Sequence, residues 1–307
     1  MVEITILDGG MGKELRRIGA PFRQPEWSAL ALTEAPEMVV QAHANFIDAG
    51  AQVIITNNYA VVPFHLGEAT FARHGAALVD LAGRLAREAV ATADVAVDIA
   101  GSMPPLFGSY LPEAFDAPRA ASIYADIAAA LAPRVDLWLG ETLSTIAEMR
   151  SIIAAIDAVG SKQPVWMSFA LPNTFDDQGP ALRSGETVAD IAAAVAATGD
   201  RVDAVLFNCS LPEQTGPALA ALRRALDAEG LRHVRTGGYA NAFPVVERDD
   251  YSAREVIYER RDELTSDRYA DIVASWVEDG ATIVGGCCDM YPVHIAALVD
   301  RFAGREM

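Results

Sequence analysis

Two segments near opposite ends of the chain, IDAGAQVII (47–55) and VEDGATIVG (277–285), follow the same pattern. In each of them a stretch with helical spacing stops at a glycine, and an apolar β-branched run follows at once. Glycine just after a helix adopts the left-handed conformation that ends the helix. Thr33 and Ser266 begin the two helical stretches, where we expect them to act as N-caps. The pattern predicts helices that lead directly into buried strands.

The same alternation of apolar strand and Ala-rich helix continues along the chain. Eight segments are candidate strands: TILDG (5–9), VIITNN (53–58), VAVDIAGS (95–102), LWLGE (137–141), VWMSFA (165–170), AVLFNCS (204–210), HVRTGGYA (233–240) and ATIVGGCC (281–288). Apolar strands separated by helices are typical of a parallel sheet covered on both faces, and eight of them suit closure into a (β/α)8 TIM barrel. The alternative is an open doubly wound sheet. No G-x-G-x-x-G follows the first strand, which disfavours its dinucleotide-binding version.

No linker or low-complexity segment divides the sequence, so we expect one barrel domain over residues 1–307. The segment at about 241–265 interrupts the alternation because it is longer and more charged than a plain connection between a strand and a helix. Long loops at this position in barrels serve as lids or interfaces. The sequence leaves both roles open.

The composition limits the partners and the compartment. A net charge of −18 repels phosphate backbones and anionic lipids, so neither nucleic acid nor a membrane is an expected partner. The N-terminus lacks the features of a secretory signal, and no apolar run reaches the ~20 residues of a membrane span. The three cysteines, two of them adjacent, do not make a disulfide framework. A cytoplasmic location therefore fits the chain best, with the oligomeric state left open.

Residues whose side chains can bind a ligand or react gather at the carboxyl ends of the expected strands. They are Asp8, Asn57, Tyr59, Glu141, Cys209, Cys287 and Cys288. This edge of a barrel carries the chemistry, because the loops that follow the strands converge there. The sixth and eighth strands are only two positions apart around a closed barrel. We therefore expect the three cysteines to meet.

The cysteines predict a shared metal site. Free cysteine often only fills space in a core, and for Cys209 alone that interpretation is the stronger one. The adjacent pair Cys287 and Cys288 argues against it, because successive strand residues face opposite ways and two inert cysteines would need two different environments. We expect Gly285 and Gly286 to supply backbone conformations that turn both sulfurs towards one point.

Three thiolates without a fourth protein ligand indicate a catalytic zinc with an open position rather than a closed structural site. The five histidines do not supply the missing ligand: His43 and His74 fall on expected helices, His65 in a loop, His233 at the start of a strand and His294 at the start of a helix. Zn²⁺ with three thiolates has a net negative charge, which suits a soft sulfur ligand better than the activation of water. The predicted reaction is transfer of an alkyl group to a zinc-bound thiol.

Short motifs along nearly the whole chain support this chemistry: ILDGGMGKELRR, WSA, DAGAQVIITNNY, GSMPP, GETLSTIAE, VWMSFA, FNCS, and VGGCC followed by PVHI. Together they resemble the zinc-dependent homocysteine S-methyltransferases, and the Asn-Cys and Gly-Gly-Cys-Cys pairs are the most specific. The resemblance implies a single (β/α)8 barrel in which Cys209, Cys287 and Cys288 hold Zn²⁺. It also implies that Asp8 and Glu141 bind the ammonium group of the amino-acid substrate.

The resemblance further implies methyl transfer from a small onium donor, with an S-methylmethionine-like compound favoured, to homocysteine, giving methionine. Aromatic faces attract onium cations, so Trp27, Tyr59 and Tyr110 are candidates for donor contacts, and Asn57 is a further substrate-binding candidate. Three alternatives stay open. They are a different thiol or selenol acceptor, a non-catalytic zinc-binding barrel with a fourth protein ligand, and a metal-independent enzyme that holds phosphate on glycine-rich turns.

Three segments depart from the family pattern. The chain has TNNY (56–59) where Thr-Asn-Thr-Tyr is common, and DM (289–290) where Gly or Arg followed by Thr is common. It also has GSMPPLFGSYLPE (101–113) in place of a more Gly-rich loop. The residues assigned to zinc and to homocysteine survive these changes. The identity of the donor, and the choice between homocysteine and another thiol as acceptor, depend on the changed segments.

Overall fold

Eight parallel strands form the centre of the computed structural model, which describes residues 3–177, 179–244 and 260–302. The strands are β1 (Thr5–Ile6), β2 (Val53–Ile55), β3 (Asp98–Met103), β4 (Leu137–Leu143), β5 (Val165–Phe169), β6 (Ala204–Asn208), β7 (Arg235–Ala240) and β8 (Ile283–Gly286). They pair in the order β1-β8-β7-β6-β5-β4-β3-β2. A parallel bridge between Leu7 and Val53 joins the two edges of the sheet. The predicted (β/α)8 TIM barrel is confirmed.

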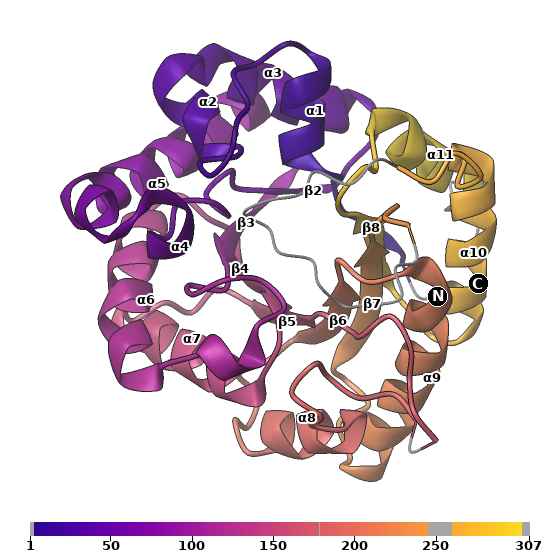
Figure 1. The fold of residues 1–307 in the computed structure, drawn as a ribbon. Coiled ribbons are helices and arrows are strands. Elements are labelled where there is room, and N and C mark those ends of the chain that lie inside the picture. Colours follow the sequence, from indigo (N-terminus) through magenta and orange to yellow (C-terminus); the bar gives the residue numbers. More distant parts are fainter. Residues whose placement is uncertain (1–2, 178, 245–259, 303–307) are drawn as a thin grey trace.

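Helices form a ring around the strands (Figure 1). They are α1 (Met11–Arg17), α2 (Ala29–Glu34), α3 (Pro36–Asp48), α4 (Pro63–Leu66), α5 (Glu68–Ala91), the 3₁₀ turn η1 (Pro112–Ala114), α6 (Ala117–Leu131), α7 (Ile146–Ala158), α8 (Val188–Ala196), α9 (Pro212–Ala228), α10 (Ser266–Glu278) and α11 (Pro292–Phe302). Each strand runs into the next through at least one of these helices. All eight strands therefore point the same way, and their carboxyl ends share one mouth.

The carboxyl ends of helices α3 and α10 agree with the sequence patterns, whereas their amino ends differ. Gly50 and Gly280, which follow α3 and α10, have φ angles of +95° and +100°. The predicted N-caps are wrong. Thr33 lies inside α2 and donates to the carbonyl of Leu30, because a separate short helix precedes α3. Thr265, one residue before the predicted Ser266, caps α10 through its side chain.

Apolar side chains form two layers. An inner layer fills the barrel and consists of Leu7, Val53, Ala100, Leu137, Leu139, Trp166, Ala204, Leu206, Tyr239 and Ile283. A larger outer layer, which includes Phe46, Tyr269 and Trp276, lies between the strands and the helices. Each fully buried large side chain stabilises the fold by about 1.5–3 kcal/mol. The strand ends are therefore held between two packed layers.

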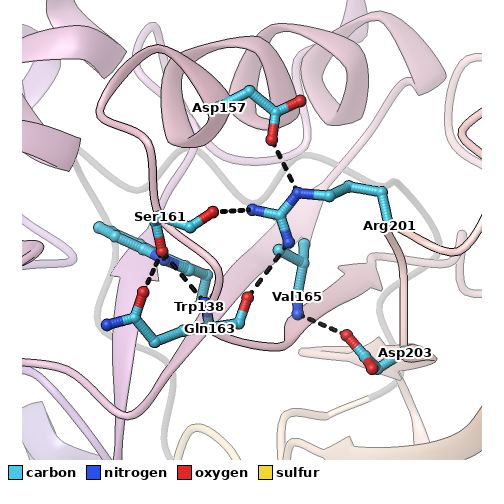
Figure 2. A network of polar contacts seen from close by, with 7 residues as sticks. All are labelled: Trp138, Asp157, Ser161, Gln163, Val165, Arg201 and Asp203. Atoms are coloured by element: carbon cyan, nitrogen blue, oxygen red, sulfur yellow. Dashed lines mark hydrogen bonds and ion pairs between the residues drawn. The ribbon is translucent and has the colours of Figure 1, made fainter.

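Polar contacts tie the loops together at the amino-terminal end of the barrel, as Figure 2 shows. Arg201 donates to the carboxylate of Asp157 and to the carbonyls of Ser161 and Gln163. The indole N–H of Trp138 donates to the hydroxyl of Ser161 at 2.7 Å. These contacts satisfy backbone groups between α7 and the strands around it. This end of the barrel serves stability, while the opposite end carries the reactive residues.

The expected excursion at about 241–265 falls mostly on residues 245–259, outside the described residues. Its two described ends meet, since the backbone N–H of Arg261 donates to the carbonyl of Ala242 at 3.0 Å. The N–H of Ala242 in turn donates to the carbonyl of Cys288. A role as a lid or interface stays a prediction, as does a single domain over 1–307. None of the helices in the described part of the chain is long and apolar enough to cross a bilayer.

Candidate metal and amino-acid site

A cavity opens at the carboxyl end of the barrel, and every site residue predicted from the sequence lines it. Its lining includes Asp8, Trp27, Asn57, Tyr59, Glu141, Cys209, Cys287 and Cys288. It also includes residues that the sequence did not single out, among them Lys13, Ser109, Thr142 and Tyr239. Residues from distant parts of the sequence therefore share one pocket, as the barrel topology requires.

The three cysteine sulfurs form a compact triangle. All three Sγ atoms lie within 4.8 Å of one another, and Sγ of Cys209 is 3.7 Å from Sγ of Cys288. A tetrahedral zinc with Zn–S bonds of about 2.3 Å separates its sulfurs by about 3.8 Å. Cys209, Cys287 and Cys288 therefore fit the donor set of one thiolate-bound metal ion. They are the only such cluster of three His, Cys, Asp or Glu residues within the described ranges.

Backbone hydrogen bonds fix the turns that carry the sulfurs. Cys209 follows β6 directly, and its N–H donates to the carbonyl of Tyr239 on β7. Cys287 follows β8, and its N–H donates to the carbonyl of Ala240 at the end of β7. The strand β7 therefore bridges the two cysteine-bearing loops and sets their spacing.

Glycines allow the cysteine turn to approach the first loop, although not in the way expected from the sequence. Gly285 and Gly286 have ordinary negative φ angles, so the predicted special backbone conformation is wrong. A Cβ atom on Gly286 would lie 2.4 Å from Cβ of Met290, and one on Gly10 would lie 2.6 Å from the carbonyl oxygen of Cys287. Gly286 therefore leaves room for the side chain of Met290 in its own turn, whereas Gly10 lets the backbone of the first loop pack against the backbone of the cysteine turn.

Left-handed backbone conformations gather around the cavity instead. Five described residues other than glycine have positive φ: Trp27, Tyr110, Thr142, Cys209 and Asp289, with values from +49° to +67°. Four of them line the cavity, and Asp289 directly follows the cysteine pair. Such conformations cost energy in non-glycine residues and concentrate at functional sites.

The electrostatics of the sulfurs favour a bound cation. Hydrogen bonds with Cys287 and Cys288, and another from the hydroxyl of Tyr110 at 2.8 Å, lower the pKa of the Cys209 thiol despite its burial. Hydrogen bonding to Cys209, together with burial, raises the pKa values of Cys287 and Cys288. Three thiolates in one buried cluster repel one another, so a divalent cation is what would hold all of them ionised.

Two buried carboxyl groups face the same cavity. Oδ2 of Asp8 accepts the backbone N–H of Ile55 at 2.8 Å, while Oδ1 is buried without a hydrogen-bond partner among the described residues. Burial raises the pKa of Asp8 well above its ordinary value, and the charge of Glu141 adds to the effect. Burial likewise raises the pKa of Glu141 to about 7, although the hydroxyl of Ser102 donates to it. Crowded, desolvated carboxyls of this kind suit a cationic ligand.

The aromatic residues that were predicted to contact the donor differ in their packing partners. The hydroxyl of Tyr59 is 2.6 Å from that of Ser109, and Trp27 packs edge-on against Phe22. The ring of Tyr110 is covered on one face by the guanidinium of Arg183, 4.4 Å from the ring centre. Asn57 donates its side-chain amide to the carbonyl of Ser28.

Asn208 is a residue that sequence reasoning did not assign, although the motif FNCS contains it. Its side-chain oxygen accepts the N–H of Thr142 and the hydroxyl of Ser168, each at 2.8 Å. Its amide nitrogen donates to the hydroxyl of Thr142 and lies 4.0 Å from Sγ of Cys287. Asn208 therefore joins the carboxyl end of β4 to the cysteine cluster.

Two of the three departures from the family pattern, TNNY and DM, have different structural roles. Asn58, the third residue of TNNY, is fully buried and donates to the carbonyl of Ser102. It does not line the cavity. Asp289, the first residue of DM, lies 3.0 Å from the ammonium group of Lys13, with both side chains buried. This pair was missed because its members are far apart in the sequence.

The histidines do not join the sulfurs. His43 is fully buried in α3, where burial lowers its pKa to about 3. His65 lies in the short helix α4 rather than in the predicted loop; it lines the cavity, and its Nδ1 contacts the carbonyl of Pro25. His294 accepts the N–H of Tyr291 through Nδ1. That cysteine alone supplies the protein ligands stays a prediction.

The mouth of this barrel thus combines three converging cysteines with two buried carboxyls. The family model of the homocysteine S-methyltransferases matches residues 5–302. The chain belongs to this family, whose general chemistry is the methylation of thiols.

Similar proteins extend over nearly the whole chain. The homocysteine S-methyltransferase of Escherichia coli (strain K12) is 29% identical over 328 residues, covering 97% of this chain and 95% of the relative. The selenocysteine methyltransferase of Astragalus bisulcatus is 24% identical, covering 96% and 91%. The crystal structure of the E. coli homocysteine methyltransferase MmuM in its metallated form has a TM-score of 0.76 at 27% identity, covering 97% of this chain and 96% of that one.

Proposed function

We propose that the chain is a zinc-dependent S-methyltransferase that moves a methyl group from a small onium donor to homocysteine, giving methionine. One observation carries the proposal. Three cysteine sulfurs within 4.8 Å of one another lie in a cavity that also contains the carboxyls of Asp8 and Glu141. A thiol and an ammonium group on one small molecule fit this combination.

Cys209, Cys287 and Cys288 are the residues that would hold Zn²⁺. When bound there, the ion would keep the substrate thiol ionised at neutral pH, because its three thiolate ligands leave a position for a fourth sulfur. Oδ1 of Asp8 and the carboxyl of Glu141 then receive the ammonium group. This contact fixes the amino acid and aims its sulfur at the cysteines.

The donor follows from charge and from the cavity walls. A positively charged leaving group lets the methyl pass directly to a thiolate, and aromatic rings attract such cations. Trp27 and Tyr59 line the cavity and offer these rings, whereas Arg183 already covers one face of Tyr110. We favour an S-methylmethionine-like donor. Three free thiols suit the reducing cytoplasm.

A second acceptor has specific support. Selenocysteine methyltransferases are among the similar proteins, at 24% and 25% identity. A selenol is softer and more acidic than a thiol and suits the same metal. The acceptor is therefore either homocysteine, which we favour, or a related thiol or selenol.

The experiment combines zinc-loaded protein with homocysteine and, one at a time, S-methylmethionine, S-adenosylmethionine, glycine betaine and dimethylsulfoniopropionate. The proposal predicts methionine from at least one donor, most rapidly from S-methylmethionine. Parallel reactions with selenocysteine rank the acceptors by kcat/KM. A protein that binds zinc but methylates none of these acceptors would instead be the non-catalytic barrel, and activity that survives chelation would contradict zinc dependence.

A further inference from the structure

A buried ion pair stands beside the cysteine cluster. Nζ of Lys13, on α1, is 3.0 Å from Oδ2 of Asp289, and their side chains are 9% and 2% exposed. Asp289 follows Cys288 directly and holds a left-handed conformation with φ of +62°. The hydroxyl of Tyr291 donates to its second oxygen at 3.2 Å. The carboxylate is therefore fixed in place, and it fixes the ammonium group of Lys13 in turn.

The two members of the pair differ in where they face. Lys13 lines the cavity, whereas Asp289 does not. Lys13 is also the only Lys or Arg among the described residues of the cavity wall. The chain has 24 Lys and Arg residues, of which only Lys13 and Lys162 are lysines. The cation of Lys13 is thus specific to this cavity wall and does not belong to a larger basic surface.

The position of Lys13 is tied to the cysteine turn. Lys13 stands three residues after Gly10, where an added Cβ would be 3.3 Å from Cα of Cys288. The N–H of Gly10 donates to the carbonyl of Met290. The first turn of α1 and the turn that carries the cysteines are therefore packed together and joined by a backbone hydrogen bond.

We infer that Lys13 binds the α-carboxylate of the acceptor amino acid and that Asp289 positions it. This inference rests on the proposed function. An amino acid with a thiol presents three groups: the sulfur for the cysteine cluster, the ammonium for Asp8 and Glu141, and the carboxylate for Lys13. A buried ammonium group that is held by a carboxylate on one side can donate hydrogen bonds to a second anion on its cavity side. Lys13 thereby selects amino acids over simple thiols.

The test compares homocysteine with 3-aminopropane-1-thiol, which keeps the thiol and the amine but lacks the carboxylate. Calorimetric titration of zinc-loaded protein without any donor measures each dissociation constant. The inference predicts that the unaltered protein binds homocysteine about tenfold to hundredfold more tightly, the range expected for a charged hydrogen bond. Lys13→Met should remove this preference by weakening homocysteine binding alone. Lys13→Arg should restore part of it.

Two further variants separate binding from structure. The double variant Lys13→Met with Asp289→Asn removes both charges and so avoids leaving Asp289 buried and unpaired; it should lose the preference as the single variant does. Lys162→Met makes the same change at an exposed position at the amino-terminal end of the barrel and should keep the preference. Zinc content and melting temperature show that each variant is folded.

Three outcomes would overturn the inference. The first is a double variant that still prefers homocysteine, which would make the pair purely structural. The second is a Lys13→Met protein whose KM rises for the donor alone, which would assign the cation to the donor carboxylate. The third is an unaltered protein that binds both thiols equally. In all three cases the proposed methyl transfer would stand, whereas failure of the unaltered protein to bind or methylate any thiol would refute the proposed function itself.

Discussion

The hydroxyl of Tyr110 lies 2.8 Å from Sγ of Cys209 and donates a hydrogen bond to it. The same bond contributes to the lowered pKa of that thiol. Tyr110 belongs to the loop after β3, whereas Cys209 follows β6, so the contact connects two opposite parts of the barrel mouth. It stabilises the ionised form of a sulfur that we assign to the metal.

Replacing Tyr110 by phenylalanine should weaken zinc binding by about tenfold, because the loss of a hydrogen bond to a metal ligand typically costs this much or more. Competition with a chromophoric chelator measures the affinity. Tyr59→Phe is the matched control, since the hydroxyl of Tyr59 contacts Ser109 rather than a sulfur. Equal zinc affinity in Tyr110→Phe and the unaltered protein would show that the hydrogen bond does not support the site.

Gly10→Ala should disturb the cysteine turn from outside. Its Cβ would lie 2.6 Å from the carbonyl oxygen of Cys287, so backbone has to move. We expect a loss of about 1–3 kcal/mol in the free energy of unfolding and weaker zinc binding, measured by urea denaturation and chelator competition. The added methyl group in Gly12→Ala would meet side chains and no backbone, Phe22 at 3.3 Å and Ser28 at 3.7 Å, and should change neither the stability nor the zinc affinity. A Gly10→Ala protein with unchanged zinc affinity would refute the proposed packing constraint.

The sequence predicted the barrel well because each strand and helix leaves a local signal. Gly50 and Gly280 end helices, and apolar runs follow them, so period and punctuation were sufficient. The strand ends then placed Cys209 and Cys287 at one mouth by topology alone. The N-caps were harder, because the short helix α2 before Pro36 has no strong signal and takes up Thr33.

Side-chain contacts between different strands and loops could not be predicted, because they leave no local signal. Lys13 and Asp289 are almost a full chain apart, and nothing local to either residue announces the pair. Asn208 was visible in FNCS, but its bonds to Thr142 and Ser168 depend on the side-by-side placement of β4, β5 and β6. Gly286 was wrongly expected to adopt a special backbone conformation. A sequence shows that the side chain is absent but not which neighbouring atoms occupy the space.

The affinity for homocysteine should fall as the pH falls through about 7. The pKa of Glu141 is raised to about 7, so the carboxyl becomes neutral below that pH and no longer attracts the substrate ammonium. Glu141→Gln should bind homocysteine about tenfold to hundredfold more weakly at higher pH and should lack the transition near 7. Calorimetry on both sides of this pH measures both effects. An unaltered transition in Glu141→Gln would assign it to another group.

Glu141→Gln should also stabilise the metal-free protein. Burial raises the pKa of Glu141 from 4.5 to about 7, so the folded state holds a proton that the unfolded chain releases between these values. Stability contributed by this group is therefore present at low pH and is lost as pH rises through that window. Above this pH window the ionised carboxylate lowers the free energy of unfolding by about 3 kcal/mol. The neutral amide of the variant does not ionise and carries no such penalty.

Urea denaturation at acidic and alkaline pH measures this difference. Glu113→Gln, at an exposed position in η1, is the control and should behave as the unaltered protein does. A Glu141→Gln protein that gains no stability at alkaline pH would show that Glu141 carries no burial penalty.

The central claim is that Cys209, Cys287 and Cys288 bind one zinc ion and leave a position for the substrate sulfur. Zinc-edge X-ray absorption tests it most directly, on the zinc-loaded protein before and after homocysteine is added. We predict three sulfur ligands at about 2.3 Å with one lighter ligand, which homocysteine replaces to give four sulfurs, and no stoichiometric zinc in Cys209→Ser. Four protein ligands that do not change when homocysteine is added, or full zinc occupancy without Cys209, would contradict the claim.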